Sequence, residues 1–423
     1  MQPKSVLPLE AIRLGEPEFW LRPPEEREGA FATLRAERPV SFHEEWDSGI
    51  LPKGPGFWSL AKHAEVLEAS RQPELFCSGK GSNIGDMPQQ FNEFFGSMIN
   101  MDDPRHARLR RIVSRGFTPR RIQQVEHEVG RKAAAIVDRV IEKGECDFVE
   151  EIAAALPLTI ICDMMGIPES QYRFVFDRTN VILGAGDPEY VPDQGNIVQA
   201  LLGAGAELSQ LAQDLGRHRA AHPGDDLVSA LVTADVEGER LTDAELGSFF
   251  VLLAVAGNET TRNAISHGMK ALCDHPDQRA IWAADFERVA PTAVDEIVRW
   301  ATPVIHFRRT ATRDTTLGGQ RIREGEKVVL WYCSANRDEE VFDAPFRFDV
   351  RRSPNPHVGF GGPGPHFCLG AHLARREITV MFRELFRRLP DLEVVEPPAR
   401  LASFFIHGIK RMRCRFTPGG ARR

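Results

Sequence analysis

The stretch Phe360-Gly-Gly-Pro-Gly-Pro-His-Phe-Cys368-Leu-Gly370 places one cysteine at the end of a loop rich in glycine and proline. Neither a strand nor the interior of a helix tolerates these two residues at such density. Three glycines, at positions 361, 362 and 364, have no side chain to keep the backbone away from a flat ligand. The stretch therefore predicts a tight loop that presents Cys368 beside a bound group.

A helix is predicted directly after this loop, over residues 369–389. Apolar side chains recur there at helical spacing: Leu373, Ile378, Met381, Phe382 and Leu385. Cys368 then lies at a helix N-terminus, where free N–H groups and the helix dipole favour a thiolate over a thiol. The ordinary alternative for a lone cysteine is a small buried apolar side chain beside a turn.

The loop resembles the haem-ligand loop of the cytochrome P-450 family, in which a cysteine thiolate is the proximal ligand of the haem iron. The resemblance implies haem b (iron protoporphyrin IX) with Cys368 as the iron ligand and Phe360, His366 and Gly370 beside the cofactor. Phe360 stands eight residues before Cys368, where many members of the family have seven. The loop of this chain thus carries one extra residue.

Composition is that of a chain with a large core: 423 residues, 42% hydrophobic and 27% charged. No linker of low complexity and no repeat of fixed period divides it. The resemblance extends over residues 1–423 and implies one domain with the mainly α, triangular fold of the family. Its small β-rich lobe is expected at about 39–60, 304–335 and 392–417. A net charge of −7 argues against a nucleic-acid partner.

Seven cysteines, an odd number without a CxxC pair, fit a reducing compartment better than a disulfide framework. The first eight residues have no apolar run typical of a signal peptide, and no stretch approaches 18 uninterrupted apolar residues. We therefore expect a cytoplasmic protein without a membrane anchor, and a monomer.

A second strong pattern is a helix of about thirty residues over 243–273, opened by the capping box of Thr242 and Glu245. It is apolar nearly all round, so it should cross the middle of the protein over about 45 Å. The polar island at 256–261, Ala-Gly-Asn-Glu-Thr-Thr, interrupts it. On its own this island is explained equally well as a kink in a core helix.

Beside the cysteine loop, the island resembles the oxygen-binding groove of the same family. The resemblance implies that Ala256 and Gly257 pass close over the haem, that Thr260 donates a hydrogen bond to bound dioxygen and that Glu259 relays protons. Glu259 stands where the family more often has Asp.

Basic side chains supply candidate partners for the two haem propionates. His106 and Arg110 are four residues apart, on one helical face, and a solvated basic face is the ordinary explanation. The resemblance assigns both to the propionates, together with Arg309, and Arg308 is the alternative to Arg309. Buried carboxylates need such donors because an unpaired buried charge is costly.

An ExxR pattern joins Glu296 and Arg299, which share one helical face. An exposed pair of this kind contributes little to stability. In the resembled family the pair is completed by an arginine from a later loop, and Arg352 matches that position. We assign this triad to folding and haem retention.

Two strands, at 307–312 and 327–333, are expected to form a hairpin about the turn at Gly318 and Gly319. Further strands are expected at 39–42, 57–60, 392–395 and 413–416, with residues 404–408 as a turn capping the pocket opposite the haem. Residues 78–100 are expected to form a long loop, either packed on the surface or acting as a lid. The predicted substrate contacts are Met98, Ile99, Ile305, Phe405 and Ile406.

The resemblance implies a haem monooxygenase that inserts one atom of dioxygen into a C–H bond of a hydrophobic molecule: a terpenoid, a sterol or a branched lipid. No flavin motif follows the haem-binding stretch, so the electrons are expected from a ferredoxin and a ferredoxin reductase. A basic face (Arg110, Arg111, Arg375, Arg376) would suit an acidic ferredoxin. A haem-thiolate sensor without turnover and a peroxide-driven peroxygenase are the alternatives, and the intact Glu259–Thr260 pair speaks against both.

Overall fold

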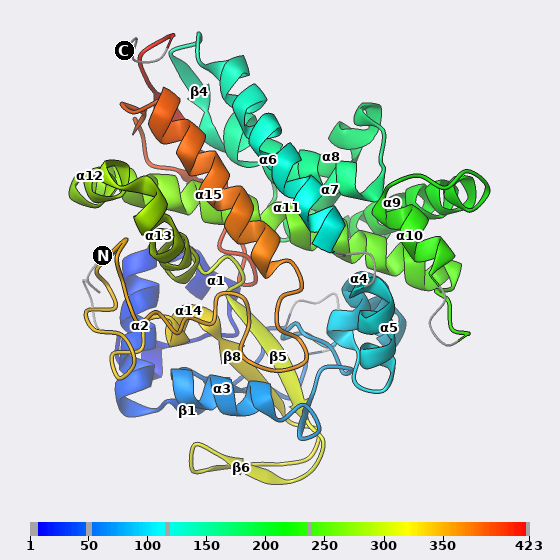
Figure 1. The fold of residues 1–423 in the computed structure, drawn as a ribbon. Coiled ribbons are helices and arrows are strands. Elements are labelled where there is room, and N and C mark those ends of the chain that lie inside the picture. Colours follow the sequence, from blue (N-terminus) through cyan, green and yellow to red (C-terminus); the bar gives the residue numbers. More distant parts are fainter. Residues whose placement is uncertain (1–6, 48–52, 115–118, 235–237, 420–423) are drawn as a thin grey trace.

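The computed structural model describes residues 7–47, 53–114, 119–234 and 238–419. Part of the N-terminal stretch on which the signal-peptide expectation rests lies outside these residues. A helical half and a β-rich half make up the described protein (Figure 1). The prediction of a mainly α fold with a small β-rich lobe is confirmed. The organisation as one domain stays a prediction.

The helical half occupies the upper part of Figure 1. Its helices are α6 (Pro119–Val140), α7 (Ala155–Met165), α8 (Tyr172–Leu183), α9 (Ile197–Ala221), α10 (Leu227–Thr233), α11 (Asp243–Asp274), α12 (Pro276–Ala284), α13 (Phe286–Ala301) and α15 (Ala371–Arg388). The sequence pattern over residues 121–235 predicts successive helices interrupted at 184–188 and at 222–224, and both interruptions fall between helices. Helix α15 begins two residues later than expected, because residues 368–370 form the turn that precedes it.

Helix α11 runs through the middle of the protein (Figure 1) and packs against α7, α9, α13 and α15. Its predicted capping box is present: the Glu245 N–H donates to Oγ1 of Thr242, and the Thr242 N–H donates to the Glu245 carboxylate at 2.9 Å. The large side chains Phe249 and Phe250 are buried. An apolar helix with a satisfied N-terminus is thus the centre of the core.

A five-stranded sheet of order β1-β2-β8-β5-β3 forms the β-rich half. Strands β2 and β8 pair in parallel and the other neighbours are antiparallel. The strands are β1 (Val40–His43), β2 (Phe57–Leu60), β3 (Phe76–Cys77), β5 (His306–Ala311) and β8 (Lys327–Trp331). The helices of this half are α1 (Pro17–Trp20), α2 (Pro24–Glu37), α3 (His63–Arg71) and α14 (Tyr332–Ala335).

The simple hairpin expected between 307 and 333 is wrong in one respect. The two predicted strands do pair, as β5 and β8, but the turn at Gly318 and Gly319 closes a separate small hairpin, β6 (Thr315–Leu317) with β7 (Gln320–Ile322). Both glycines have positive φ, 53° and 76°. This is the backbone of a two-residue hairpin turn, which joins strands that pair immediately beside it.

The expectation that residues 78–100 form one irregular loop is also wrong. They contain helix α4 (Gln89–Gly96) and a one-turn 3₁₀ helix at Ser97–Asn100. Phe91, Phe94, Phe95 and Met98 recur at three- and four-residue spacing, which is a helical period. Helix α4 packs against α11, so tertiary contacts stabilise a segment whose glycine and asparagine content suggested a loop.

The remaining strands are β4 (Glu145–Asp147), β9 (Glu393–Val394), β10 (Ala399–Arg400), β11 (Ile409–Arg411) and β12 (Arg413–Arg415). The strand-like stretches predicted at 392–395 and 413–416 correspond to β9 and β12, while β4 interrupts residues 121–235, where the pattern predicts successive helices. No helix among the described residues combines the length and apolar character needed to cross a membrane.

Candidate functional site

The cysteine loop is held by its own backbone and by α3. The N–H of Cys368 donates to the carbonyl of Phe360 at 3.0 Å. A Cβ on Gly362 would lie 2.6 Å from Oγ of Ser70, and one on Gly364 would clash with the Ser70 carbonyl oxygen. These two glycines are therefore required by close packing on the end of α3, a reason that the sequence alone did not provide.

The thiol of Cys368 has accessible surface, yet neighbouring protein groups strip it of much of its water. Desolvation raises the pKa of Cys368, against the opposing effects of the Gly370 N–H, Arg110 and Arg375. The Gly370 N–H at the start of the helix acts in the expected direction, but desolvation has the larger effect on the pKa. Direct coordination of a metal cation is the interaction that deprotonates such a thiol.

The polar island of α11 lies next to this loop, since Ala256 and Leu369 belong to one apolar cluster. Ala256, Gly257 and Thr260 are half-buried, whereas most of the surrounding helix is buried. The Thr260 hydroxyl donates to the Ala256 carbonyl at 2.8 Å. A Cβ on Gly257 would lie 3.1 Å from Cδ1 of Ile161, so this glycine also makes room for α7.

Glu259 points away from the accessible side of α11 and is 1% exposed. One carboxylate oxygen pairs with Arg262, and the other has no hydrogen-bond partner among the described residues. Arg262 also donates to Oδ1 of Asn180, on α8, at 2.9 Å. Burial raises the pKa of Glu259, and Arg262 opposes this shift. The sequence analysis missed Arg262 and Asn180, although the three-residue spacing from Glu259 to Arg262 was visible.

The predicted propionate ligands gather around His366. The ring of His106, on α5 (Arg105–Ser114), lies 4.3 Å from that of His366, and Arg110 donates to the Phe367 carbonyl at 2.8 Å. Burial first, and then the charges of Arg309, His106 and Arg110, lower the pKa of His366 to about 2. Four residues from three distant parts of the sequence thus come together near Cys368.

Arg309 and Arg308 have different partners. Arg308 donates to Oδ1 of Asp86 at 2.7 Å and to several backbone carbonyls. Arg309 is buried, and the hydrogen bond recorded for its guanidinium is to the carbonyl of Arg308 at 2.8 Å. Burial lowers the pKa of Arg309. Of the two arginines, Arg309 is the one with donors to spare for an anion.

These features fit a flat, dianionic cofactor that carries its own metal. A metal already held by a macrocycle needs few ligands from the protein, and the thiol of Cys368 can supply one. The Nε2 atom of His106 is buried and has no hydrogen-bond partner among the described residues. With Arg110 and Arg309 it provides donors of the kind that two buried carboxylates require.

The ExxR triad has the predicted contacts. Arg299 donates to both carboxylate oxygens of Glu296, at 2.7 and 2.8 Å, and Arg352 donates to the same carboxylate at 3.0 Å. Arg299 also donates to the carbonyls of Asn336 and Pro345. The triad is buried and joins α13 to the segment that leads into the cysteine loop.

The predicted substrate contacts do not all lie together. Met98 and Ile99 belong to the same apolar cluster as Ala256. Phe405 packs on Phe307, with ring centroids 5.6 Å apart, and Ile406 forms a β-bridge with Val304.

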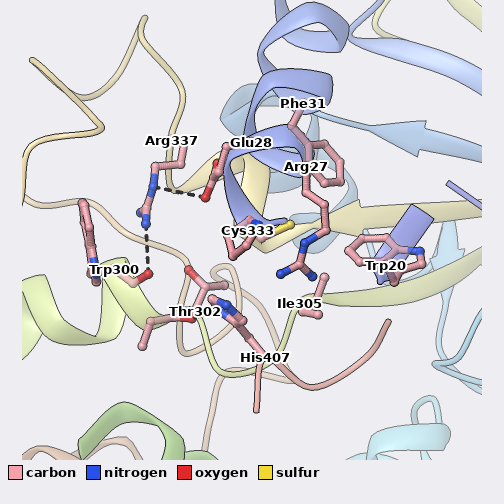
Figure 2. Close-up of a pocket in the computed structure, with 12 residues that line it drawn as sticks. Trp20, Arg27, Glu28, Phe31, Trp300, Thr302, Ile305, Cys333, Arg337 and His407 are labelled. Carbon is pink, nitrogen blue, oxygen red and sulfur yellow. Dashed lines mark hydrogen bonds and ion pairs between the residues drawn. The ribbon is translucent and has the colours of Figure 1, made fainter. Parts of the chain in front are cut away.

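Ile305 faces elsewhere. It is buried in the cluster that includes Phe31 and Trp331, and it lines a pocket beside Arg27 and Cys333 (Figure 2). Successive side chains of an extended segment point to opposite faces, so the neighbours of Ile305 are directed away from this cluster. The structure thus does not bring Ile305 together with Met98 and Ile99.

Comparison with known proteins agrees with this site. The family model of cytochrome P450 matches residues 288–399. A methyl-branched lipid omega-hydroxylase of Mycobacterium tuberculosis is 51% identical over 416 residues, which cover 97% of this chain and 96% of the relative. A steroid C26-monooxygenase of Mycolicibacterium smegmatis is 43% identical over 370 residues, covering 86% and 84%.

Among solved structures, a cytochrome P450 of Mycobacterium marinum in complex with pseudoionone superimposes with a TM-score of 0.92. It is 46% identical, and the match covers 97% of this chain and 100% of that one. The identity to characterised relatives extends over nearly the whole chain, and so does the similarity of fold. Together with a cysteine loop facing the central helix, this shows that the chain belongs to the cytochrome P450 family.

Proposed function

We propose that this monooxygenase, a haem b enzyme of the cytochrome P450 family, hydroxylates a methyl-branched lipid or terpenoid with electrons from a ferredoxin and its reductase. The name of the relative that is 51% identical supports a methyl-branched lipid as substrate. A sterol is the second candidate, supported by the steroid C26-monooxygenase at 43% identity.

The observation that carries the proposal is the apolar cluster beside Ala256. Its members are aliphatic or methionine side chains with a single aromatic ring: Met98, Ile99, Met101, Leu109, Val113, Leu227, Leu231, Val232, Leu241, Leu246, Phe249, Leu252, Leu253, Ala256 and Leu369. A substrate that enters beside Ala256 would therefore meet apolar side chains, which suit a hydrophobic ligand. Unbranched and flexible methionines adapt to an irregular surface such as a branched chain.

In this proposal, Cys368 ligates the haem iron, while His106, Arg110 and Arg309 bind the propionates. The bound haem supplies the oxidising chemistry on dioxygen and the C–H bond. The buried Glu296–Arg299–Arg352 triad holds the segment that leads into the cysteine loop. The protein thereby fixes the position of the cofactor relative to α11.

Thr260 and Glu259 manage protons. The Thr260 hydroxyl, now bonded to the Ala256 carbonyl, rotates to donate toward dioxygen in the site. Glu259 keeps one oxygen on Arg262 and one without a partner among the described residues. Burial raises the pKa of the Glu259 carboxyl against the opposing effect of Arg262, so release from Arg262 would favour uptake of a proton that the carboxyl could then exchange with water.

The ferredoxin would dock on the face near the thiolate. Phe367 is exposed there, Arg110 donates to its carbonyl, and Arg375 lies over the ring of Phe360 at 4.4 Å. Reversal of the charge of the exposed Arg111 should slow reduction by ferredoxin at low salt and leave it nearly unchanged at high salt. Arg321→Glu, on the distant β6–β7 hairpin, is the control. An equal rate in both variants at low salt would exclude this docking face.

A spin-state titration of the haem-loaded protein tests the substrate. The probes are a methyl-branched fatty acid, its straight-chain isomer, a terpenoid and a sterol, followed by product analysis with a ferredoxin system. We expect the branched chain to give the largest spin shift and a hydroxylated product. A larger shift with the sterol, and turnover of the sterol alone, would replace the proposal by the sterol alternative.

A further inference from the structure

A second pocket lies among α1, α2, the end of α13 and the turn around His407 (Figure 2). None of the residues placed around Cys368 lines it. Aromatic and aliphatic walls, Trp20, Phe31 and Ile305 among them, enclose a polar centre.

The polar centre contains a guanidinium without an ionic partner. Arg27 extends into the pocket toward Cys333 and His407 (Figure 2). Within the described part of the chain, no hydrogen bond or ion pair joins Arg27 to a carboxylate, and its recorded contact is with the ring of Trp20, 6.0 Å away. Arg337, by contrast, lies 3.7 Å from Glu28 and donates to the carbonyl of Trp300.

Arg400 adds a third positive charge. Its guanidinium donates to Nε2 of His407 at 3.4 Å, and the charge of Arg27 contributes, after burial, to lowering the pKa of Arg400. Against the effect of burial, the charge of Glu25 raises the pKa of Arg27 and of Arg400 by electrostatic attraction, and no hydrogen bond between Glu25 and either arginine is seen among the described residues. Of the charged side chains that line the pocket, Arg27 and Arg337 are positive and Glu28 is negative, while Arg400 and Glu25 lie outside the lining.

The two histidines beside the arginines are neutral. His407 donates from Nδ1 to the carbonyl of Ala301 at 2.7 Å, and its ring lies 4.2 Å from that of His267. Burial and the nearby positive charges lower the pKa of both rings, that of His267 to about 3. The pocket therefore has an excess of one positive charge together with unused guanidinium donors.

We propose that this pocket binds a monocarboxylate with a small apolar body, at a site separate from the haem. The planar fork of Arg27 matches a carboxylate with two parallel hydrogen bonds. One excess positive charge suits a monoanion, and the first turn of the 14-residue helix α2, which begins at Pro24 on the pocket wall, adds the favourable end of its dipole. The walls formed by Trp20 and Phe31 suit the apolar body.

Occupancy of this site stabilises a segment that reaches the predicted substrate contacts. The N–H of Ile305 donates to the carbonyl of Phe405 at 2.8 Å, and that of His407 donates to the carbonyl of Pro303 at 2.9 Å. A carboxylate on Arg27, beside His407, links α2 to the turn that carries Phe405. Binding should therefore raise the melting temperature without changing the haem spectrum.

The test uses haem-loaded protein and isobutyrate, with isobutyramide as the neutral probe, in calorimetry and thermal unfolding. We expect isobutyrate to bind and isobutyramide to fail. Arg27→Gln should weaken binding roughly ten- to hundredfold, from the loss of a charge-assisted hydrogen bond, and Arg400→Gln should weaken it less, because Arg400 does not line the pocket. Arg22→Gln, whose arginine pairs with Glu26 on the surface, is the matched control. Equal binding of the two probes, or no effect of Arg27→Gln, would overturn the proposal.

The carboxylate could come from the lipid substrate itself or from a separate small acid. This distinction rests on the proposed function, whereas binding of isobutyrate does not. The first outcome is that Arg27→Gln weakens the binding of a methyl-branched fatty acid, but not of the corresponding alcohol, in the spin-state titration. The pocket then holds the acidic end of the substrate. If Arg27→Gln weakens only the binding of isobutyrate, the site binds a separate small acid. An effect on neither ligand contradicts the site.

Discussion

Two glutamate–arginine pairs at three-residue spacing are buried in neighbouring helices, and they differ in how completely they are bonded. Glu296 and Arg299 lie in α13, and Glu259 and Arg262 lie in α11. Both pairs have the same residue types, sequence order and depth. Their different surroundings therefore indicate what each pair does.

The pair in α13 is saturated. Both oxygens of Glu296 accept hydrogen bonds from Arg299, Arg352 joins them, and the N–H of Asp349 adds another at 2.9 Å. The pair in α11 leaves Oε1 of Glu259 and Nε of Arg262 without partners among the described residues. A saturated network fixes a structure, whereas a buried carboxyl with a spare oxygen can still take up a proton.

The largest effect is expected from Glu296→Gln. It removes a charge that faces two buried arginines, and the free energy of unfolding should fall by roughly 3–5 kcal/mol. Denaturant unfolding and the haem content of the purified protein measure the loss. Arg347→Gln, which removes an arginine that pairs at the surface with Asp349, is the control. A loss below about 1 kcal/mol would show that the triad is not what holds this region.

Glu259→Gln should separate activity from stability. We expect the rate of product formation to fall about a hundredfold or more, as for the loss of a general acid or base. The protein should still fold and bind haem, and it should lose less stability than Glu296→Gln. Steady-state turnover is measured in light and in heavy water, and the ratio of the two rates gives the solvent isotope effect on proton delivery. An unchanged rate and solvent isotope effect would remove Glu259 from proton delivery.

Arg262→Ala should make stability more dependent on pH. Burial already raises the pKa of Glu259 above its ordinary value of 4.5, and Arg262 opposes that shift, so its removal raises the pKa further. A carboxyl with a raised pKa favours the folded state while protonated, and this contribution is lost as the pH rises. The stability deficit of Arg262→Ala should therefore grow from acidic to neutral pH.

Unfolding of the parent and of Arg262→Ala at about pH 5 and about pH 8 measures this difference. Arg262→Lys keeps the positive charge and should reduce the dependence. A deficit that is the same at both pH values would mean that Glu259 does not titrate with folding.

The smallest effect is expected from Asn180→Ala, which takes one hydrogen bond from Arg262 across α8 and α11. The cost should be about 1–3 kcal/mol, the usual penalty for a buried donor without its partner. Thr179→Ala is the control, because the hydroxyl of this neighbouring residue donates to the Phe176 carbonyl within α8. Equal losses of unfolding free energy in both variants would show that the hydrogen bond between Asn180 and Arg262 adds nothing to stability.

Much of the fold could be predicted because its signals are local. The capping box of Thr242 and Glu245 and the apolar run behind it mark the start of α11, and strand β2 has the predicted bounds. Helix α4 was missed because its stability depends on packing against α11. The hairpin at Gly318 was misplaced because a turn signal does not tell which strands it joins.

The sequence by itself determined the cysteine at position 368, the central helix with its Glu259–Thr260 pair and the ExxR pair, since each depends on residue type and short spacing. Only the tertiary structure decided that Arg309 rather than Arg308 keeps free donors, that Gly364 must accommodate Ser70 and that Ile305 faces Arg27. These outcomes depend on which distant segments meet. A pattern along the chain records the order of its residues, and the contacts between segments exist only after the core has packed.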